Sequence, residues 1–412
     1  MYLKLRHNKW WAEHDVPSAM RSALGRRLSR SLGTSDQAQA ERLASLLWLH
    51  DWSRRLRGIK VTQDDDTEAA FFKDLIRKAE NDAVRADLID HVGDLARSRA
   101  EKALDRGDEA GADAAERFAK LATGRLTPLA EPLDEWLAGI GDTDKTKAMK
   151  RSTILKLAAA IPYAQNVDHA SLQKWFAALA KADGVSTKTM GRVLSFVRGY
   201  WKHLKSQSIV AGDPFSDLTL PQTRRSASWV PFDPAEVVAL VKHARDSGDP
   251  ELADLATLGM WSGARIEELC SLAVSDVRMR TKSFAIKDAK TAAGIREVPI
   301  HDKLMPTLRR LVGKRTGGYV LAGLLANKYG DRSNAIGKRF GRLKKVAGFG
   351  PTLVFHSIRK CVGTQLENSL VPEGVSADIL GHEKPNITYG LYSGGASLEV
   401  KRAALERLRY PM

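Results

Sequence analysis

Residue types able to carry out phosphoryl-transfer chemistry cluster between residues 355 and 395. His356 and Arg359 stand in H-x-x-R spacing, so on a helix they would share one face. His382 ends a Leu-Gly-His sequence, and Tyr392 follows it by ten residues. A guanidinium offers a planar fork of donors to a phosphate, an imidazole can exchange a proton near neutral pH, and a tyrosine hydroxyl can attack phosphorus. An isolated H-x-x-R is more often solvated or structurally paired, so its meaning depends on the rest of the chain.

A second candidate anion site lies upstream, in the sequence WSGARIEEL that runs from Trp261 to Leu269. A glycine-containing turn leads there directly into an expected helix with Arg265 in its first turn. Free backbone N–H groups and a guanidinium would then meet at one point, which suits an anion. Taken alone, Arg265 would more often be an ordinary surface arginine.

The charge balance points to a polyanionic partner. The 412 residues carry a formal net charge of +16 and have a pI of about 9.7. Nucleic acid is the first candidate for such a chain, although membrane surfaces and acidic proteins also attract basic proteins. Two cysteines match neither a disulfide framework nor a metal-binding spacing, and no run is long and apolar enough to span a bilayer. We therefore expect a cytoplasmic protein without a membrane partner.

The first half of the chain is predicted to contain one small sheet followed by helices. Alternation at residues 2–6, 10–16 and 27–34 predicts three strands, and Ser35 or Asp36 can cap a helix after them. Basic side chains on this sheet could enter a DNA groove, or the sheet could serve only for packing. The sequence predicts charge-rich helices without candidate catalytic residues at 60–125. It predicts a compact helical domain at 126–212. Ser186 is expected to cap the clearest helix of that domain.

A basic, proline-containing linker separates the last domain from the others. In that domain helices are predicted at residues 234–247, 249–261 and 334–347, with a strand pair at 282–288 and 296–301. The helix at 334–347 carries Lys338, Arg339, Arg342, Lys344 and Lys345 mostly on its outward side. Such a helix can be a merely solvated face, but beside a phosphate site it more plausibly contacts a DNA backbone.

The order of these motifs resembles the tyrosine recombinase (phage integrase) family. S-G-A-R-I-E-E-L, a lysine in a strand turn, H-x-x-R, L-G-H and a tyrosine follow one another through residues 236–395. The resemblance implies a mostly α fold with small β-sheets. Its domains would be an N-terminal α/β arm-binding-like domain, a helical connector, a helical core-binding (SAM-like) domain, a linker, and a mixed α/β catalytic domain with a C-terminal tail helix. Their expected ranges are 1–60, 61–125, 126–213, 214–235 and 236–412.

The same resemblance implies a role for each matching residue. Arg265 and Arg359 would bind the non-bridging oxygens of the scissile phosphate, and Glu268 would brace the site. Lys290 would protonate the leaving 5′ oxygen, with Lys282 and Lys287 as competing candidates. His356 would accept the tyrosine proton or bind phosphate, and His382 would donate a hydrogen bond to it. Tyr392 would be the nucleophile, with Tyr389 as its rival, and the 3′-phosphotyrosine would need neither ATP nor a metal cofactor for rejoining.

The implied function is site-specific DNA recombination for the integration or excision of a mobile element. Its partners would be double-stranded DNA at core and arm sites, three further copies of the chain in a homotetramer, and accessory DNA-bending or excision factors. The alternatives are a type IB topoisomerase-like or resolvase enzyme and a non-catalytic DNA-binding accessory protein. The sequence leaves open whether the tail after Tyr392 docks on its own domain or on a neighbouring protomer.

Overall fold

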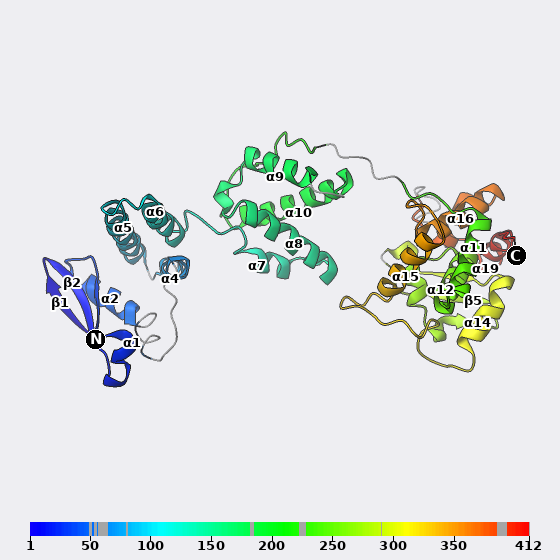
Figure 1. Ribbon diagram of the computed structural model, residues 1–412, viewed down its shortest axis with the longest axis horizontal. Helices are drawn as coiled ribbons and strands as arrows, with labels where there is room; N and C mark the ends of the chain where they lie inside the picture. Colours follow the sequence, from blue (N-terminus) through cyan, green and yellow to red (C-terminus); the bar gives the residue numbers. More distant parts are fainter. Residues whose placement is uncertain are drawn as a thin grey trace. The chain divides into compact units, whose positions relative to one another are not determined.

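The computed structural model describes residues 1–48, 52, 56, 65–79, 81–181, 185–221, 228–289, 291–384 and 394–411. These residues form two compact units, Met1–Arg225 and Ser226–Met412, and each is considered by itself. Both units are mostly helical, and a small antiparallel sheet occurs in each (Figure 1). Within the described residues, no helix is long and apolar enough to cross a membrane. The expected fold class, mostly α with small β-sheets, is confirmed.

The N-terminal sheet has the strand order β1-β2-β3, and each neighbouring pair is antiparallel. Its strands are β1 (Tyr2–Arg6), β2 (Lys9–Asp15) and β3 (Arg27–Ser31). His7 and Asn8 both have positive φ, 43° and 60°, which matches the twist of a two-residue hairpin. Asp36 accepts a hydrogen bond from the Gln39 N–H at 2.6 Å and so caps α2 (Gln37–Leu47). The predicted strands and cap are therefore present.

The helices after this sheet share its hydrophobic core. They are α4 (Asp65–Arg77), α5 (Asp82–Leu104) and α6 (Glu109–Ala122), which pack against one another (Figure 1). Ala12 and Leu28 of the sheet lie in one buried cluster with Phe72 of α4 and Phe118 of α6. The segment interpreted as a helical connector thus completes the core of the N-terminal sheet.

A second core in this unit lies among four helices. They are α7 (Leu133–Gly139), α8 (Asp144–Ala160), α9 (His169–Lys181) and α10 (Thr187–Ser206). Ser186 caps α10 as predicted, accepting from the Thr189 N–H at 3.2 Å. Tyr200 is buried against Trp136, and its hydroxyl donates to the Leu129 carbonyl at 2.6 Å. Tyr200 is therefore a core residue.

The C-terminal unit is built around a helix that is buried on all sides. In this helix, α12 (Pro250–Ser262), every residue from Leu252 to Ser262 is buried. The other helices are α11 (Pro234–Asp246), α13 (Ile266–Cys270), α14 (Met305–Val312), α15 (Ser333–Val346), α16 (Phe355–Asn368), α17 (Glu373–Leu380) and α19 (Leu398–Leu405). The strands are β4 (Val277–Arg278), β5 (Ser283–Ile286) and β6 (Arg296–Pro299), in the order β4-β5-β6. The predicted strand pair is present, and β4 is an additional strand.

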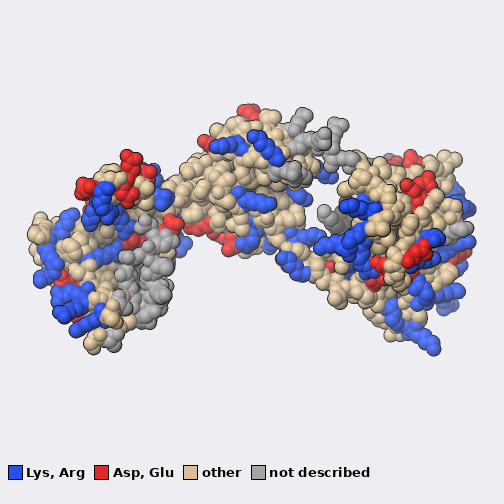
Figure 2. All heavy atoms as spheres, viewed as in Figure 1, with Lys and Arg blue, Asp and Glu red and all other residues tan. Residues whose placement is uncertain are grey.

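The basic helix α15 is less uniformly outward-facing than its sequence indicates. Lys338, Arg342 and Lys345 are exposed, and Figure 2 shows basic side chains over this part of the unit. Arg339 instead pairs with Asp249, and its Nη1 lies 2.8 Å from Glu251 Oε2. The outward assignment of Arg339 was wrong, because two acidic residues at the start of α12 draw its side chain inward.

The tail helix α19 packs on its own unit, against α17 and β6. Leu405 and Leu408 are buried in the core of this unit. The Tyr410 hydroxyl donates to the Met260 carbonyl of α12 at 2.9 Å, and Lys401 Nζ donates to the Glu297 carbonyl at 2.7 Å. In this single chain the tail docks on its own unit, which is one of the two arrangements that the sequence left open.

Candidate active site

Arg359 joins the ends of two helices. It lies one turn into α16, with only 3% of its surface exposed. Its Nη1 donates to the carbonyl of Gly263, directly after α12, at 2.8 Å, and its Nη2 donates to the carbonyl of Leu380, the last residue of α17. The predicted helix at the H-x-x-R sequence therefore directs this guanidinium inward, where main-chain carbonyls hold it in place.

Arg265 reaches the same helix end from the other side of the site. As the N-cap residue of α13, it donates from Nη1 to Glu268 Oε1 at 2.7 Å and from Nη2 to the Gly381 carbonyl at 3.0 Å. Its side chain remains 38% exposed. Because Arg265 and Arg359 bind the successive carbonyls of residues 381 and 380, their guanidiniums lie close together. The structure thus brings together two predicted site residues that are far apart in the sequence.

Two glycines allow this close approach. Gly263 and Gly381 have φ of 64° and 67°, the left-handed region that ends a helix. A Cβ on Gly263 would lie 2.6 Å from Leu380 Cδ2, and one on Gly381 would lie 2.7 Å from Arg296 Nη1. Side chains at either position would push the helix ends away from the arginines that bind them.

Arg296 is a member of the site that the sequence analysis did not assign. Only 5% of its side chain is exposed, and its Nη2 lies 3.0 Å from Glu268 Oε2. Its Nε also donates to the Ile379 carbonyl of α17 at 2.7 Å. A signal existed in the sequence, since Arg296 shares the face of β6 with the apolar Val298, where an arginine needs a buried partner.

Glu268 connects the arginines, as its expected bracing role requires. Its two carboxylate oxygens accept from Arg265 and Arg296. Burial would raise the pKa of this carboxyl, but the hydrogen bonds and charge of Arg296, then those of Arg265, hold its pKa below the usual value. Glu268 is therefore ionised at neutral pH and is already occupied by two cations.

The site nevertheless keeps an excess of positive charge. Among the described residues, the hydrogen-bond partners of Arg265, Arg296 and Arg359 include the carboxylate of Glu268 and otherwise main-chain carbonyls. Burial, followed by the charges of Arg265 and Arg296, lowers the pKa of Arg359 to about 9, so it stays charged at pH 7. Three guanidiniums around a single carboxylate favour the binding of an anion.

His356 and His382 lie beside this cationic cluster. Burial lowers the pKa of both imidazoles, and the charge of Arg359 is the next cause for each. Starting from an ordinary value of 6.5, both rings are therefore neutral at pH 7 when no anion is bound. The main-chain N–H of His382 donates to the Ala377 carbonyl at 3.0 Å, which holds it at the end of α17. A neutral imidazole near a bound phosphate can accept a proton.

Three of the predicted or rival site residues, Lys290, Tyr389 and Tyr392, lie outside the described residues. The two rival lysines are described, and both are paired. Lys282 Nζ lies 2.8 Å from Asp302 Oδ1, and Lys287 pairs with Asp276. Lys290 remains the candidate that the family resemblance prefers. In the described part of the chain, no group of three or more His, Cys, Asp or Glu residues could hold a metal ion.

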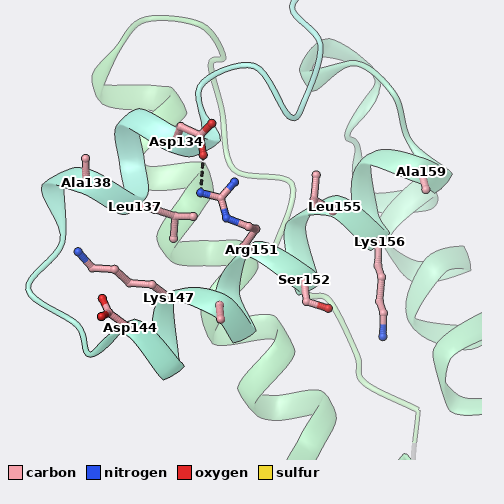
Figure 3. Close-up of a pocket in the computed structure, with 11 residues that line it drawn as sticks. Asp134, Leu137, Ala138, Asp144, Lys147, Arg151, Ser152, Leu155, Lys156 and Ala159 are labelled. Atoms are coloured by element: carbon pink, nitrogen blue, oxygen red, sulfur yellow. Dashed lines mark ion pairs between the residues drawn. The ribbon is translucent and has the colours of Figure 1, made fainter. Parts of the chain in front are cut away.

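A wide groove lies elsewhere, in the N-terminal unit. This groove, about 870 Å³, runs between α7 and α8, and basic side chains project from its α8 wall (Figure 3). Arg151 forms an ion pair there with Asp134, beside Leu137 and Leu155 (Figure 3). None of the six predicted catalytic residues lines it. It is open and lacks a set of reactive groups, so side-chain chemistry locates the candidate site better than volume does.

Comparison with known families agrees with this arrangement. Residues 231–396 match a family model described as the phage integrase family. Residues 2–57 match a model described only as a domain of unknown function, DUF6538. The first match contains Arg265, Arg296, Arg359 and His382, whereas the second assigns no role to the N-terminal sheet.

Curated relatives are tyrosine recombinases. The XerC recombinase of Mycobacterium tuberculosis (strain H37Ra) is 26% identical over 226 residues, which is 51% of this chain and 74% of that protein. XerC of Mycobacterium leprae is 28% identical over 222 residues, with the same two coverages. A tyrosine recombinase of Thermosipho africanus is 24% identical over 152 residues, 36% of this chain and 53% of that protein.

Solved structures of two integrases share the fold. The Tn1549 transposon integrase, in complex with a circular intermediate DNA, aligns with a TM-score of 0.51 and 20% identity over 68% of this chain and 99% of that one. A lambda integrase dimer bound to a COC′ core site aligns with a TM-score of 0.52 and 15% identity over 94% of this chain and 93% of that one. Together, the family match, the curated relatives and the shared fold identify residues 231–396 as a phage integrase family domain.

Proposed function

We propose that the chain is a tyrosine recombinase, an integrase that cuts and rejoins DNA at specific sites to integrate or excise a mobile element. The observation that carries the proposal is the pairing of Arg265 and Arg359 on the successive carbonyls at the end of α17, with two histidines beside them. This arrangement suits a single phosphate with two non-bridging oxygens.

In the proposed reaction, the Tyr392 oxygen attacks the scissile phosphorus. A bond forms between that oxygen and phosphorus, the bond from phosphorus to the 5′ oxygen breaks, and Lys290 gives the leaving oxygen a proton. His356 takes the tyrosine proton, and His382 donates a hydrogen bond to the phosphate. Arg265 and Arg359 offset the charge of the five-coordinate transition state. The reverse attack by a 5′ hydroxyl rejoins the DNA.

We further propose that the chain acts on double-stranded DNA as a homotetramer. Lambda integrase has been solved as a tetramer bound to a Holliday junction, and that structure aligns with 64% of this chain at a TM-score of 0.51. The same assembly here would exchange strands in pairs, with accessory DNA-bending or excision factors setting the direction. An enzyme acting on such DNA would work at the nucleoid, in the cytoplasm.

A covalent-trapping experiment tests the proposed function. Purified wild-type protein is mixed, in EDTA, with a pool of nicked duplexes tiled across the DNA that flanks its coding sequence. The loss of the short fragment beside the nick prevents rejoining, so we expect a protein–DNA complex that resists SDS and forms at defined sites. A two-site plasmid carrying those sequences should then recombine. Site-independent relaxation of supercoiled DNA would instead indicate a topoisomerase, and no covalent complex would indicate an accessory protein.

We also propose that the outer face of the N-terminal sheet binds arm-type DNA. The inner face, with Ala12 and Leu28, is buried in the core of the unit. Cross-strand pairs place Lys4 opposite Trp11 and Arg6 opposite Lys9 on the other face. Figure 2 shows basic side chains over this part of the unit. Arg6 on this face pairs with Glu13, and the exposed Lys4 and Lys9 beside Trp11 suit contacts with a DNA groove.

This second proposal predicts a change in the salt dependence of DNA binding. Replacing Lys4 and Lys9 together by alanine removes two cations, and the slope of log K against log salt falls by about 0.9 for each phosphate that the protein no longer neutralises. A slope change of about 2 is expected for the whole protein on a mixed-sequence duplex. The control replaces Lys102 and Lys120, which lie on α5 and α6 and alter the net charge equally. Equal slope changes for both variants would contradict the assignment of this face.

A further inference from the structure

A single carboxylate, that of Asp378, binds residues on both sides of the segment that carries the candidate nucleophile. Its Oδ1 lies 2.7 Å from Lys384 Nζ. Its Oδ2 accepts a hydrogen bond from the Ala396 main-chain N–H at 2.7 Å. Residues 385–393, among them Tyr392, lie between these two points and outside the described residues. We call residues 385–395 the tyrosine segment.

These contacts are partly withdrawn from solvent, unlike an ordinary surface ion pair. The side chains of Lys384 and Asp378 are only 12% and 20% exposed. Gly395, with φ of 84°, lies so close that an added Cβ would be 3.3 Å from Asp378 Oδ2. Pairs in such surroundings are screened less by water and salt than exposed pairs are. The geometry therefore holds the C-terminal end of the tyrosine segment tightly against α17.

The same helix also contacts the phosphate-binding arginines. Asp378 lies on α17, two residues before Leu380, whose carbonyl accepts from Arg359. The next carbonyl, that of Gly381, accepts from Arg265. One turn of helix thus connects the groups that would bind the scissile phosphate with both ends of the tyrosine segment. A fixed helix of this kind can set the distance between a nucleophile and the atom it attacks.

We propose that Asp378 is a positioning residue for the cleavage reaction, holding both ends of the tyrosine segment at a set distance from the two arginines. The inference rests on the proposed function and on Tyr392 as nucleophile. Asp378 touches neither the phosphate nor the tyrosine in this scheme. It acts through Lys384 and Ala396.

The test measures the first-order rate of covalent complex formation at saturating nicked DNA, together with the Kd for DNA and the Tm. Asp378→Ala removes both contacts, Asp378→Asn keeps an acceptor for the Ala396 N–H, and Lys384→Met removes the ion pair alone. The control variants Lys242→Met and Asp246→Asn break an exposed ion pair on α11. We expect the rate to fall by about 10- to 100-fold for Asp378→Ala and less for the other two, because a shift of about 1 Å can cost 10²-fold. The Kd for DNA and the Tm of these three variants should not change, and the two control variants should keep the wild-type rate.

Several outcomes would overturn the proposal. An unchanged rate for Asp378→Ala would do so. A fall in rate accompanied by weaker DNA binding and a lower Tm would also do so, because it would indicate a structural role. If Asp378→Ala does not fold, the rates of Asp378→Asn and Lys384→Met decide the question in the same way. Absence of a covalent complex with wild-type protein would contradict the proposed function itself, which keeps the two failures distinct.

Discussion

Replacing Tyr392 by phenylalanine is expected to abolish the covalent protein–DNA complex while leaving the Kd for DNA unchanged. Phenylalanine keeps the ring but lacks the oxygen that would attack phosphorus, so neither cleavage nor a phosphotyrosine bond can form. Removing a nucleophile costs on the order of 10⁶ in rate in the best-studied cases, so the complex should fall below detection. The measurement is denaturing gel electrophoresis of the nicked-duplex reaction.

The matched control for this prediction is Tyr389→Phe. Tyr389 lies three residues before Tyr392 in the same tyrosine segment and is the rival nucleophile on sequence grounds. Its replacement should leave the covalent complex intact. Loss of the complex with Tyr389→Phe and its survival with Tyr392→Phe would reverse the assignment. Survival with both single variants would show that neither tyrosine alone is required for attack.

Arg265→Ala is expected to lower the first-order rate of covalent complex formation by about 10²- to 10³-fold, or about 3–4 kcal/mol of transition-state stabilisation. Of the two arginines, Arg265 is the better one to replace, because its loss should affect the stability of the fold less. Its side chain is 38% exposed, whereas Arg359 is almost fully buried and holds two helix ends together. Loss of Arg359 would therefore reduce stability as well as rate.

Two further variants sharpen this prediction. Arg265→Lys keeps the charge but lacks the planar fork that fits two phosphate oxygens, so its rate should fall between those of alanine and wild type. Arg245→Ala, at an exposed position of α11, removes the same charge away from the site and should keep the wild-type rate. Equal losses for Arg265→Ala and Arg245→Ala, with Arg265→Lys at the wild-type rate, would mean that net charge alone, and not the arrangement of Arg265, matters for the reaction.

Local features of the chain could be predicted from sequence because they depend on neighbours a few residues away. Asp36 and Ser186 were expected at helix starts, and both side chains accept the hydrogen bonds of a helix cap. The helix through His356 and Arg359 was predicted in the same way and is present as α16. The hairpin of β5 and β6 followed from period-two alternation and turn residues.

Partners distant in the chain could not be predicted from such patterns. Arg339 looks outward by helical spacing, yet Asp249 and Glu251 bind it from the start of α12. Arg296 had no assigned role from the sequence, although in the fold it holds Glu268 and the end of α17. In both cases a buried or half-buried arginine pairs with carboxylates that lie some thirty to ninety residues away in the sequence. The periodicity of one helix or strand does not indicate which distant carboxylate its arginine will bind.

The sequence by itself determined the kinds of reactive side chain, their order, and the helices and hairpin that carry them, because residue type and short-range spacing set those features. Only the tertiary structure decided which groups meet. The ends of α12 and α17 face Arg359 because Gly263 and Gly381 adopt left-handed conformations without a Cβ in the way. The tail returns to its own unit because Leu405, Leu408 and Tyr410 complete that unit's core. Such contacts arise from packing between distant elements, which is a property of the folded chain and not of any single stretch of it.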